Sequence, residues 1–576
     1  MPFTRCLALV LAFVMGQELA AQQRPFDVVI VGGRVLDGTG NPWFYSDVGI
    51  VDGRIVALGK LAGQPAARII DAKGRMVSPG FIDIHSHADE STGGARTLRA
   101  EDPRRRAAPN LVTQGITTVV VNQDGRSPWP IAQQKQTLES KRTGVNTVLL
   151  VGHGEVRRQV MGTDYQRPAT AQEVQRMRGL VRQAMEEGAS GMSAGLEYVP
   201  GRWSTTDEVA ALVQEIVPFA GVYISHERSE GSDPMWYWPS RDPAGPPTLI
   251  DAVRETIEIG ERTGATVVAS HLKAKGAHYW GSSAAAIQLI ERARARGVQI
   301  YGDQYPYDTS GSDGSTVLIP DWVYQGGRGQ GAADYVAALR SVIADAARNR
   351  DLRRDVAHEI QRRGGAEKVV VFDYPNKDMV GKSLAQLASA RQLDPVDMAL
   401  ALQLEGYPNR QGGARVRGFS LAELDIEAYA RQPWMATATD GGLALPDDGP
   451  AVHARFYGTF PRKIRKYALD RGIIGLEHAV RSATALPAQI LGFKDRGVIR
   501  EGAAADIVVF DVDRIRDKST FFEPHQYSEG IDFVLVNGQL VVDAGKPTGA
   551  HPGKVLTLGP ARRGARTTTD GEDWKR

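Results

Sequence analysis

Residues 80–87 read GFIDIHSH, a short apolar run that leads directly into two histidines, His85 and His87. Such a run is typical of a buried strand, and the period-two spacing of the histidines points both imidazoles to one side of it. Similar short apolar runs lead into other polar residues, namely Asp124, His153, His226, His271 with Lys273, and Asp440. If these runs are parallel strands of one barrel, their carboxyl ends share one face. We therefore expect these side chains, which are hundreds of residues apart in sequence, to meet there.

The middle of the chain alternates such runs with amphipathic helices, which is typical of βα repeats and a parallel sheet. Thr170 and Thr205, each followed three residues later by a glutamate, form capping boxes that predict two helix starts. We predict an α/β fold with a (β/α)8 TIM-like barrel over residues 80–489. Between about residues 310 and 406 the alternation loosens. We interpret this segment as an inserted lid, with ordinary barrel helices and long loops as the alternative.

Both ends of the chain are β-rich and are punctuated by turn dipeptides. Four such dipeptides separate short β-rich runs: Asp37-Gly38, Asp52-Gly53, Lys73-Gly74 and Asn537-Gly538. Asp-Gly and Asn-Gly are the strongest short-range hairpin signals. Two β-rich ends around a long α/β middle indicate one small domain built from both termini. We predict a β-sandwich formed by residues 26–79 and 490–556.

The first 21 residues have the layout of a secretory signal peptide. One charge, Arg5, precedes an apolar run from Cys6 to Met15, and the small residues Ala20 and Ala21 follow. We predict an exported protein, periplasmic or secreted, with a buried N-terminal strand as the alternative. Because Cys6 is the only cysteine, the exported protein would have neither disulfides nor thiolate ligands.

Composition limits the partners that this chain can bind. Its 69 basic and 67 acidic residues nearly cancel, so no large field is available for a phosphate backbone and no nucleic-acid partner is expected. No run of about 18 uninterrupted apolar residues follows the first segment, so no stable membrane anchor is expected. We expect a small-molecule or short-peptide substrate. Residues 557–576 lack apolar periodicity and are predicted to be disordered, and the sequence leaves the oligomeric state open.

Histidines and carboxylates at strand ends are suitable ligands for a divalent metal. Neutral imidazole and carboxylate bind zinc, and a hydrolytic site keeps one coordination position for water. Five of the 11 histidines follow apolar runs. Those predicted to bind metal, together with Asp440, are His85, His87, His226 and His271. The alternatives are a surface His-x-His pair, core histidines and a helix N-cap at Asp440. His153 is predicted either to support the ligands or to contact substrate.

Motifs along nearly the whole chain resemble the amidohydrolase superfamily, and within it the N-acyl-D-amino-acid deacylases, also called D-aminoacylases. They extend from about Asp27 to Lys554 and include PGFIDIHSH, GMSAGLEYVPG, YISHERSE, SHLKAKG, DQYPY, TDG and HARFYGTFPR. The family is similar in having a metal-bearing barrel, a β-sandwich built from both termini and an inserted lid. The resemblance implies an enzyme that hydrolyses amide bonds with zinc.

The resemblance also divides the metal ligands into two sets. His226 and His271 look like ligands of a tightly bound zinc. His85, His87 and Asp440 look like a second, weaker or optional divalent-metal position. In the family, the residue that corresponds to Asp440 is also the catalytic acid/base.

The remaining site residues are expected around the metal and the substrate. Where well-known members place a metal-bridging cysteine, this chain has Asp124, and a carboxylate can also bridge two cations. Lys273 and Tyr305 match residues that contact substrate in the family. Arg455 lies in an element expected to border the site, with a solvated salt bridge as the alternative. Lys273 or Arg228 is the expected partner of a substrate carboxylate.

The leading hypothesis is hydrolysis of N-acyl-D-amino acids, or of short peptides with a D-residue, to a carboxylate and a free D-amino acid. Water activated by the metal would attack the carbonyl carbon, and Asp440 would move the proton to the leaving nitrogen. Tyr305 or His153 would donate a hydrogen bond to the tetrahedral intermediate. Two alternatives stay open. One is another amidohydrolase reaction, such as cyclic amide opening or dipeptide cleavage, and the other is an exported metal-barrel protein that binds a ligand without turnover.

Overall fold

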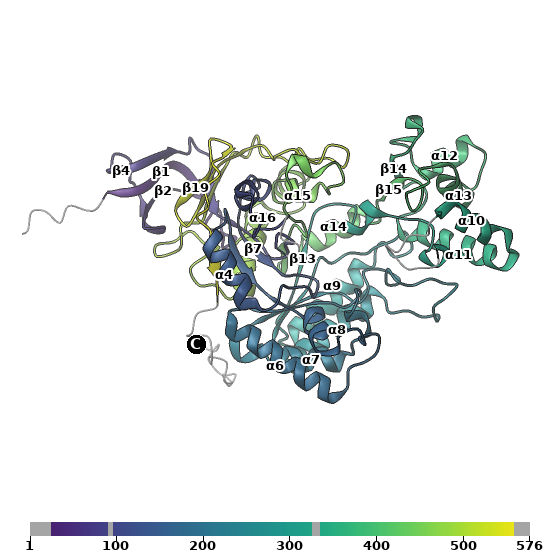
Figure 1. The fold of residues 1–576 in the computed structure, drawn as a ribbon. Helices are drawn as coiled ribbons and strands as arrows, with labels where there is room; N and C mark the ends of the chain where they lie inside the picture. Colours follow the sequence, from purple (N-terminus) through teal and green to yellow (C-terminus); the bar gives the residue numbers. More distant parts are fainter. Residues whose placement is uncertain (1–24, 90–95, 325–333, 558–576) are drawn as a thin grey trace, which may run out of the picture.

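The computed structural model describes residues 25–89, 96–324 and 334–557. Over these residues the chain is an α/β protein with three neighbouring parts (Figure 1): a β-rich part, a central part of parallel strands and helices, and a mostly helical part. The predicted signal peptide and residues 558–576 of the predicted disordered tail lie outside the described residues. Within the described ranges, no helix combines the length and the apolar character that crossing a membrane requires.

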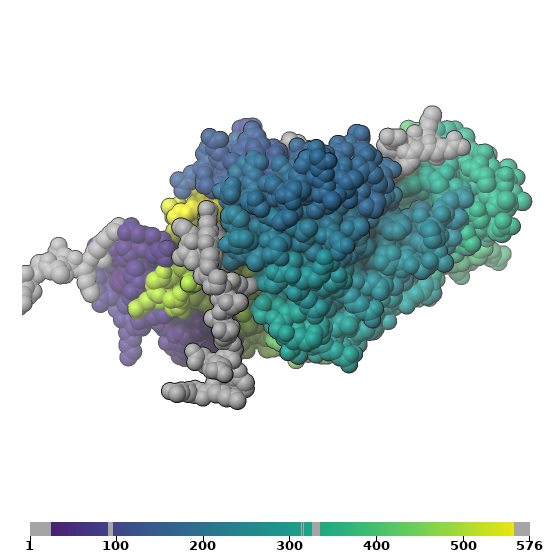
Figure 2. Space-filling view, turned by 90° about the horizontal axis from the view of Figure 1, so that it is seen from below, coloured from purple at the N-terminus to yellow at the C-terminus, as the bar shows by residue number. Residues whose placement is uncertain are grey.

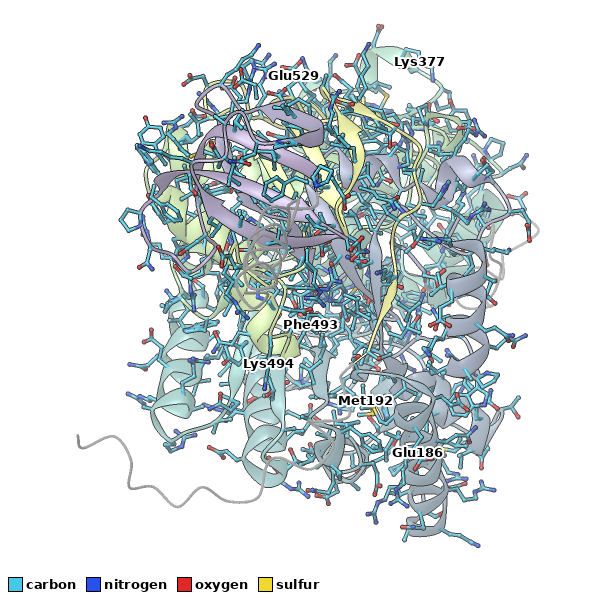
Figure 3. All side chains as sticks on the ribbon, turned by 90° about the vertical axis from the view of Figure 1, so that its left-hand side faces the viewer. Glu186, Met192, Lys377, Phe493, Lys494 and Glu529 are labelled. Carbon is cyan, nitrogen blue, oxygen red and sulfur yellow. The ribbon has the colours of Figure 1, made fainter. Side chains whose placement is uncertain are left out.

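The β-rich part is a nine-stranded sheet that combines strands from both ends of the described chain. Its junction is the antiparallel pairing of β5 (Met76–Pro79) with β17 (Ile507–Phe510). The other strands are β1 (Phe26–Val35), β2 (Phe44–Val51), β3 (Arg54–Gly59), β4 (Ala66–Asp71), β18 (Ile531–Val536), β19 (Gln539–Asp543) and β20 (Lys546–Pro547). Figure 3, viewed from this side, shows the purple N-terminal strands beside the yellow C-terminal ones. Ile30, Ile50 and Leu535 belong to the core that they share.

Two of the predicted turn dipeptides join hairpins in this sheet. Asp52-Gly53 connects β2 to β3, and Asn537-Gly538 connects β18 to β19. Their φ angles are all positive, at 50°, 72°, 49° and 81° in chain order. A two-residue type I′ turn needs this combination, because its twist matches that of the flanking strands. The turn predictions at these two positions are confirmed. The prediction of a hairpin turn at Lys73-Gly74 is wrong, because the strands on either side of it, β4 and β5, both pair parallel to β1.

The central part holds two parallel sheets, with the strand orders β21-β8-β7-β6 and β16-β13-β12-β11-β10-β9. The strands are β6 (Phe81–Asp83), β7 (Ile116–Val121), β8 (Asn146–Leu149), β9 (Val151–Gly152), β10 (Gly191–Gly195), β11 (Val222–His226), β12 (Thr266–Ala269), β13 (Ile300–Gln304), β16 (Met435–Thr437) and β21 (Val555–Leu556). Nearly every residue of β6 to β16 in these sheets is buried. Short, continuous buried runs are expected where helices or other elements cover both faces of a sheet.

The two parallel sheets adjoin at both edges. On one side, β8 and β9 are separated only by Leu150. On the other side, Ser86, just after β6, forms a parallel bridge with Gly441, just after β16. The His87 N–H also donates to the Gly441 carbonyl at 2.8 Å. The carboxyl ends of β6 and β16 are therefore held together, although they are more than 350 residues apart in sequence.

Helices connect the successive parallel strands. They are α2 (Pro103–Arg106), α3 (Pro109–Val112), α4 (Ile131–Lys141), α5 (His153–Met161), α6 (Ala171–Glu187), α7 (Thr206–Val213), α8 (Leu249–Thr263), α9 (Ser283–Ala295) and α14 (Glu423–Ala430), with α15 (Arg455–Arg462), the π-helix η7 (Lys463–Asp470), α16 (Leu476–Ala483) and α17 (Ala485–Leu491) after β16. Both predicted helix starts are confirmed, because Thr170 and Thr205 each accept a hydrogen bond from the N–H three residues later, and Gly188 ends α6. Of the two, only Thr170 has the full capping box, since the carboxylate of Glu208 pairs with His153 and Arg157. Figure 2, seen from below, shows that the blue and teal segments that contain these helices make up most of this face.

A further part of the chain lies between β13 and β16. Its elements are η3 (Gly311–Ser315), η4 (Asp321–Tyr324), α10 (Tyr335–Ala344), α11 (Ala346–Arg362), β14 (Val369–Asp373), η5 (Lys377–Met379), α12 (Leu384–Ala390), α13 (Pro395–Glu405) and β15 (Arg415–Gly418). A hydrophobic core of its own runs from Leu318 to Val416. This core continues beyond residue 406, where the sequence predicted the segment to end, because β15 pairs antiparallel with β14.

Candidate metal centre and active site

The carboxyl ends of five parallel strands bring the predicted metal ligands together. These residues are His85 and His87 after β6, Asp124 after β7, His226 at the end of β11, His271 after β12 and Asp440 after β16. His87 is the most exposed, with 19% of its side chain accessible, and the others are almost completely buried. The sequence therefore places ionisable groups where water is nearly excluded and where strand ends meet.

One group of donor atoms is formed by His85, His87 and Asp440, whose ligand atoms lie within 4.8 Å of one another. Nε2 of His87 is 2.8 Å from Oδ1 of Asp440, and Nε2 of His85 is 3.6 Å from the same oxygen. The other ring nitrogen of His85, Nδ1, lies 2.5 Å from Oγ of Ser270, which donates to Asp303. Both histidines therefore turn Nε2 towards the Asp440 carboxylate.

A second group is formed by Asp124, His226 and His271. Oδ1 of Asp124 is 3.4 Å from Nδ1 of His226 and 3.7 Å from Nε2 of His271, and these two nitrogens are 2.9 Å apart. Asp124 also faces the first group, with its oxygens 3.5 Å from Nε2 of His85 and 3.7 Å from Nε2 of His87. Asp124 thus lies between the two groups, where a bridging carboxylate would lie.

These donors fit a divalent cation. Nε2 of His85 and Oδ1 of Asp124 are buried, and neither has a hydrogen-bond partner among the described residues. Buried polar atoms in native proteins are nearly always satisfied, so two unsatisfied atoms that face each other indicate a ligand between them. Imidazole nitrogen and carboxylate oxygen are the donor types that zinc takes in hydrolytic sites.

Electrostatic effects keep three of these donors in the forms that bind metal, whereas at His226 the carboxylates of Asp124 and Glu197 outweigh burial and raise the pKa to about 10, so a metal would have to displace a proton there. Burial alone would raise the pKa of the Asp124 carboxyl, but the imidazoles of His226 and His271 outweigh it and hold that pKa well below its usual value. Arg455 and the imidazoles likewise hold the pKa of Asp440 well below its usual value, against the effect of burial. Burial, reinforced by His271, lowers the pKa of His85 well below its usual value. At neutral pH the two carboxylates are therefore ionised and His85 is neutral, as metal ligands must be.

Three of the ligands have a backbone conformation that L-residues seldom adopt. Asp124, His271 and Asp440 have φ angles of 58°, 34° and 47°. Such conformations cost on the order of 1–3 kcal/mol each and persist where the surrounding structure imposes them, often at functional sites. Next to Asp124, a Cβ on Gly125 would lie 2.8 Å from the backbone nitrogen of Gly195. Glycine at position 125 therefore permits the close packing that holds Asp124 in place.

The two donor groups open into a hollow of about 760 Å³. Its lining includes Lys273, just after His271, and Arg455, at the start of α15. Nη1 of Arg455 donates to Oδ2 of Asp440 at 2.8 Å. A Cβ on Gly311 would lie 2.6 Å from Nη2 of Arg455, so Gly311 provides room for the guanidinium group. Two buried cations next to a metal site favour a substrate with an anionic group.

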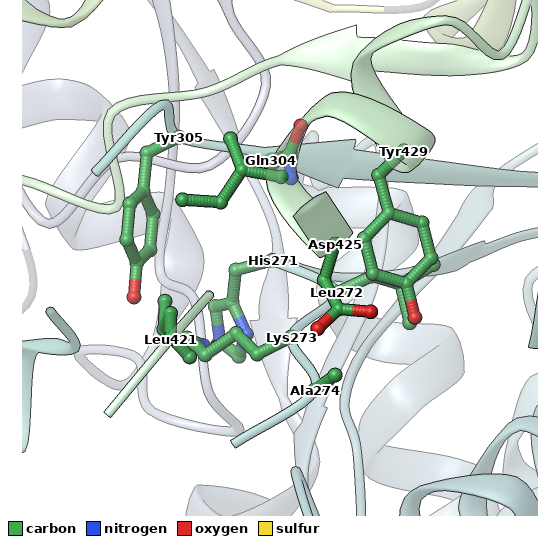
Figure 4. A pocket seen from close by; sticks show the side chains of 10 residues that line it. His271, Leu272, Lys273, Ala274, Gln304, Tyr305, Leu421, Asp425 and Tyr429 are labelled. Atoms are coloured by element: carbon green, nitrogen blue, oxygen red, sulfur yellow. The ribbon is translucent and has the colours of Figure 1, made fainter. Parts of the chain in front are cut away.

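Tyr305, just after β13, lies beside both cations. Its ring centre is 5.4 Å from Nζ of Lys273 and 4.7 Å from Cζ of Arg455. Figure 4 shows Tyr305, His271 and Lys273 around a small pocket of about 10 Å³. The Tyr305 hydroxyl is buried and has no hydrogen-bond partner among the described residues. It is therefore available to donate a hydrogen bond to a bound molecule.

Two residues predicted to contact substrate lie elsewhere in the structure. His153 begins α5, and its Nε2 is 2.9 Å from Oε1 of Glu208. Glu208 lies in the first turn of α7, where its N–H donates to the N-cap Thr205. Arg228 forms a bidentate ion pair with Glu255 of α8: its Nε donates to Oε2 and its Nη2 to Oε1, each at 2.8 Å. Neither residue lines the hollow. Glutamates on neighbouring helices hold Nε2 of His153 and the guanidinium group of Arg228 in place. Lys273 rather than Arg228 is therefore the cation that faces the hollow.

Two glutamates that contact the candidate ligand histidines were not predicted from the sequence. Oε2 of Glu197 is 3.1 Å from Nε2 of His226, and Oε1 of Glu230 is 3.2 Å from Nδ1 of His271. Carboxylates in this position fix the orientation and the tautomer of a metal-binding imidazole. A usable signal exists for both residues, since Glu197 follows strand β10 just as the ligands follow theirs and Glu230 comes four residues after His226.

Comparisons with known proteins identify relatives over almost the whole chain. The model of the amidohydrolase family matches residues 68–227 and 291–542. The N-acyl-D-glutamate deacylase of Alcaligenes xylosoxydans xylosoxydans is 32% identical over 94% of this chain and 99% of that protein, and the D-aminoacylase of the same organism is 30% identical over 93% and 98%. A crystal structure of N-acyl-D-glutamate deacylase from Bordetella bronchiseptica, complexed with zinc and a phosphonate mimic of the tetrahedral intermediate, is 31% identical. It superposes with a TM-score of 0.70 over 93% of this chain and 100% of that one.

The fold and the site thus define a metal-dependent hydrolase, in which strand ends of an α/β protein gather histidines and carboxylates around a hollow. The chain belongs to the amidohydrolase family, and it is related to the N-acyl-D-amino-acid deacylases. The family predicted from the sequence motifs is confirmed.

Proposed function

We propose that this chain hydrolyses the amide bond of N-acyl-D-amino acids, or of short peptides with a D-residue, and releases a carboxylate and a free D-amino acid. The observation that carries the proposal is that residues from both groups of candidate metal ligands line one hollow together with Lys273 and Arg455. The D-configuration is supported by the relatives, which include a D-aminoacylase and an N-acyl-D-glutamate deacylase.

A closed barrel with a lid belongs to the same proposal. The parallel strands from β6 to β16 neighbour one another in chain order, and the bridge between Ser86 and Gly441 links the last strand to the first. We infer that they form one (β/α)8 barrel with a β-sandwich beside it. Three residues between β13 and β16 line the hollow: Ser310, which directly precedes η3, Ser312 in η3, and Arg417 in β15. This supports the interpretation of that part as a lid.

Two metal positions are proposed, with the Asp124 carboxylate between them. The ligands of the tight zinc position are His226, His271 and Asp124, and those of the weaker divalent-metal position are His85, His87 and Asp440. A divalent cation held there supplies a Lewis acid, which polarises the scissile carbonyl and lowers the pKa of water from about 15.7 towards 7.

Asp440 is proposed as the catalytic acid/base. Its Oδ2 accepts a hydrogen bond from Arg455, and its Oδ1 also faces Nε2 of His87 at 2.8 Å. When the weaker metal position is empty, Oδ1 would accept the proton of the attacking water and pass it to the leaving nitrogen. Asp440→Asn is expected to lower kcat by about 10²–10⁴-fold while the tight zinc stays bound, as measured by steady-state kinetics and metal analysis. If the variant keeps most of its kcat with metal bound, Asp440 is not the acid/base.

Lys273 and Arg455 are proposed to bind the carboxylate of the substrate. Nε of Arg455 is buried without a hydrogen-bond partner among the described residues, and the ammonium group of Lys273 lines the same hollow. The Tyr305 hydroxyl would donate to the oxygen that becomes negative in the tetrahedral intermediate. A carboxylate held on one side of the hollow presents the acyl group of only one enantiomer to the metal ligands, which would explain a preference for D-substrates.

A substrate panel tests this function directly. Zinc-loaded enzyme would be assayed with N-acetyl-D-amino acids, the matching L-forms, hydantoins and dipeptides that contain a D-residue. We expect amine release from the N-acetyl-D-amino acids, loss of this activity after exhaustive chelation, and its return when zinc is added. Reaction with cyclic substrates alone would instead indicate a cyclic amidase, and tight binding without product would indicate a non-catalytic binding protein.

Export from the cytoplasm is a separate proposal, and it depends only on residues 1–21. The test is expression of the full chain in a Gram-negative host, followed by fractionation and N-terminal sequencing. A mature chain that starts close after Ala21 would support export. A full-length chain confined to the cytoplasm would contradict it.

A further inference from the structure

Glu230 connects a metal ligand to the lysine that faces the hollow. Its Oε1 lies 3.2 Å from Nδ1 of His271 and also accepts a hydrogen bond from Nζ of Lys273. Its Oε2 accepts from Nζ of Lys275 at 3.3 Å. The side chain of Glu230 is only 7% exposed. One buried carboxylate therefore holds an imidazole and two ammonium groups at once.

The backbone fixes Glu230 at this junction. The Lys275 N–H donates to the Glu230 carbonyl at 3.0 Å, and Gly231 forms a parallel bridge with Lys275. A Cβ on Gly231 would lie 2.3 Å from the Lys275 carbonyl oxygen, which is too close for any other residue. The loops after β11 and β12 are thus locked together, and the carboxylate is placed before any ligand binds.

The partner of Nδ1 decides which face of His271 can bind metal. When Nδ1–H donates to Glu230, the lone pair lies on Nε2, which faces Asp124. The ammonium group of Lys273 also lies near Nδ1, at 2.7 Å, but an ammonium can only donate. A hydrogen bond from Lys273 to Nδ1 would place the ring proton on Nε2, where it would block a metal. Glu230 prevents this because it accepts from both groups.

Glu230 could instead be regarded as a metal ligand, because it forms a third cluster of donor atoms with His226 and His271. Two observations argue against a cation at that place. The ammonium groups of Lys273 and Lys275 already neutralise the carboxylate and would repel a further cation. The ring nitrogens on this side are also the ones that face away from Asp124.

We propose that Glu230 is a positioning residue that holds His271 in its metal-binding tautomer and holds Lys273 towards the substrate carboxylate. Glu197 orients the other imidazole, that of His226, and holds no lysine: it contacts Nε2 of His226 and the backbone N–H of Met235, at 3.1 and 2.6 Å. The inference rests on the metal site of the proposed function but not on the identity of the substrate. Its main test therefore uses zinc alone.

The test compares the variants Glu230→Gln and Glu197→Gln with the control Glu215→Gln. Glu215 is also a buried glutamate, but its partners are Arg178 and Arg182 of α6, and none of the three lines the hollow. The zinc dissociation constant is measured by competition with a chromophoric chelator, without substrate. We expect both test variants to bind zinc about 10–100-fold more weakly, while the control stays within twofold of wild type. With substrate, KM should rise for Glu230→Gln and stay unchanged for Glu197→Gln at saturating zinc.

A double variant makes the test sharper. In Glu230→Gln with Lys273→Met, no ammonium competes for Nδ1 of His271, so zinc affinity should return towards wild type while substrate binding stays weak. If Glu230→Gln does not fold, Glu230→Asp takes its place, because the shorter side chain should weaken zinc binding in the same direction. Unchanged zinc affinity in the folded variant would overturn the proposal. So would a cobalt-substituted spectrum that shows the loss of one ligand, since Glu230 would then bind the metal directly.

Discussion

Among the described residues, two buried clusters that combine histidine with carboxylate can be compared, and only one of them has donor atoms that converge as a set of metal ligands would. The first is the metal centre around Asp124. The second consists of His153, Glu208 and Arg157, which are all at most 3% exposed. Both clusters follow the ends of parallel strands. Burial and position at a strand end therefore do not separate a ligand histidine from a structural one.

The two clusters differ in how many donor atoms converge. At the metal centre, three residues at a time place ligand atoms within 4.8 Å of one another. In the second cluster a single imidazole contacts Glu208, and Arg157 neutralises the same carboxylate. The backbone differs as well, because His153 begins a regular helix whereas Asp124 has a left-handed φ. Converging lone pairs on an unusual backbone, rather than burial alone, mark the functional site.

The largest expected effect comes from removing one histidine of each cluster. His226→Ala removes a proposed ligand of the tight zinc, so zinc should bind more weakly by more than the 10–100-fold that outer partners contribute. Activity should fall with it. His153→Ala should keep its zinc and instead lose about 1–3 kcal/mol of unfolding free energy, because Glu208 loses a buried partner. Metal analysis after gel filtration, steady-state kinetics and urea unfolding measure the three quantities.

Two results would contradict this distinction between the clusters. If His153→Ala loses zinc as readily as His226→Ala, the second cluster takes part in metal binding, and convergence is not the property that separates the two. If His226→Ala retains full zinc and activity, the assignment of the tight position is wrong.

Much of the site could be predicted because strand ends have a sequence signature. An apolar run followed by a polar residue identifies where a parallel strand stops, and the structure brings those residues together after β6, β7, β11, β12 and β16. Turn dipeptides such as Asn537-Gly538 identified hairpins in the same way, because few residues tolerate positive φ. In both cases the information is local in the sequence.

The partners of these residues could not be predicted, because partners come from distant elements. Arg228 lies two residues after His226, and the sequence predicts either Lys273 or Arg228 as the partner of the substrate carboxylate, but Glu255 of α8 forms an ion pair with Arg228. Nothing in the spacing specifies which helix residue packs against a given strand end. The pairing of Glu230 with His271 and Lys273 likewise joins separate loops that only the folded chain brings together.

A second prediction compares Arg228, which the sequence suggests for the substrate carboxylate, with Arg455, which the structure suggests for it. Arg455→Gln should lower kcat/KM by about 10–100-fold, because a hydrogen bond to a charged group contributes roughly 1.5–3 kcal/mol. Arg228→Gln should leave kcat/KM within about twofold. It should lower the unfolding free energy by about 1–3 kcal/mol, because Glu255 loses its partner. Kinetics with an N-acetyl-D-amino acid and urea unfolding of both variants would distinguish the two roles. A large kinetic loss in Arg228→Gln would place that residue back at the substrate.

The smallest expected effect on catalysis comes from Lys463, in η7. Its Nζ is buried and has no hydrogen-bond partner among the described residues. Like Nε2 of His85, this nitrogen is a buried polar atom without such a partner, but in the described part of the chain no other candidate metal ligand converges on it. Burial lowers the pKa of Lys463 to about 7, so the folded protein keeps the amine neutral at pH values where the unfolded chain protonates it, below about 10.4. Between these values the unfolded state binds more protons, and the stability of the wild-type protein therefore rises with pH.

Lys463→Met should remove this penalty and leave kcat unchanged. The variant should be more stable than wild type by on the order of a few kcal/mol near pH 7, and the difference should shrink by about 1.4 kcal/mol for each pH unit towards 10. Urea unfolding of both proteins from pH 6.5 to 9.5 measures this difference. A gain that does not change with pH would mean that packing rather than charge controls the effect. A loss of zinc or activity would mean that a single buried nitrogen contributes to the metal centre. That result would contradict the conclusion that converging donor atoms mark the functional site.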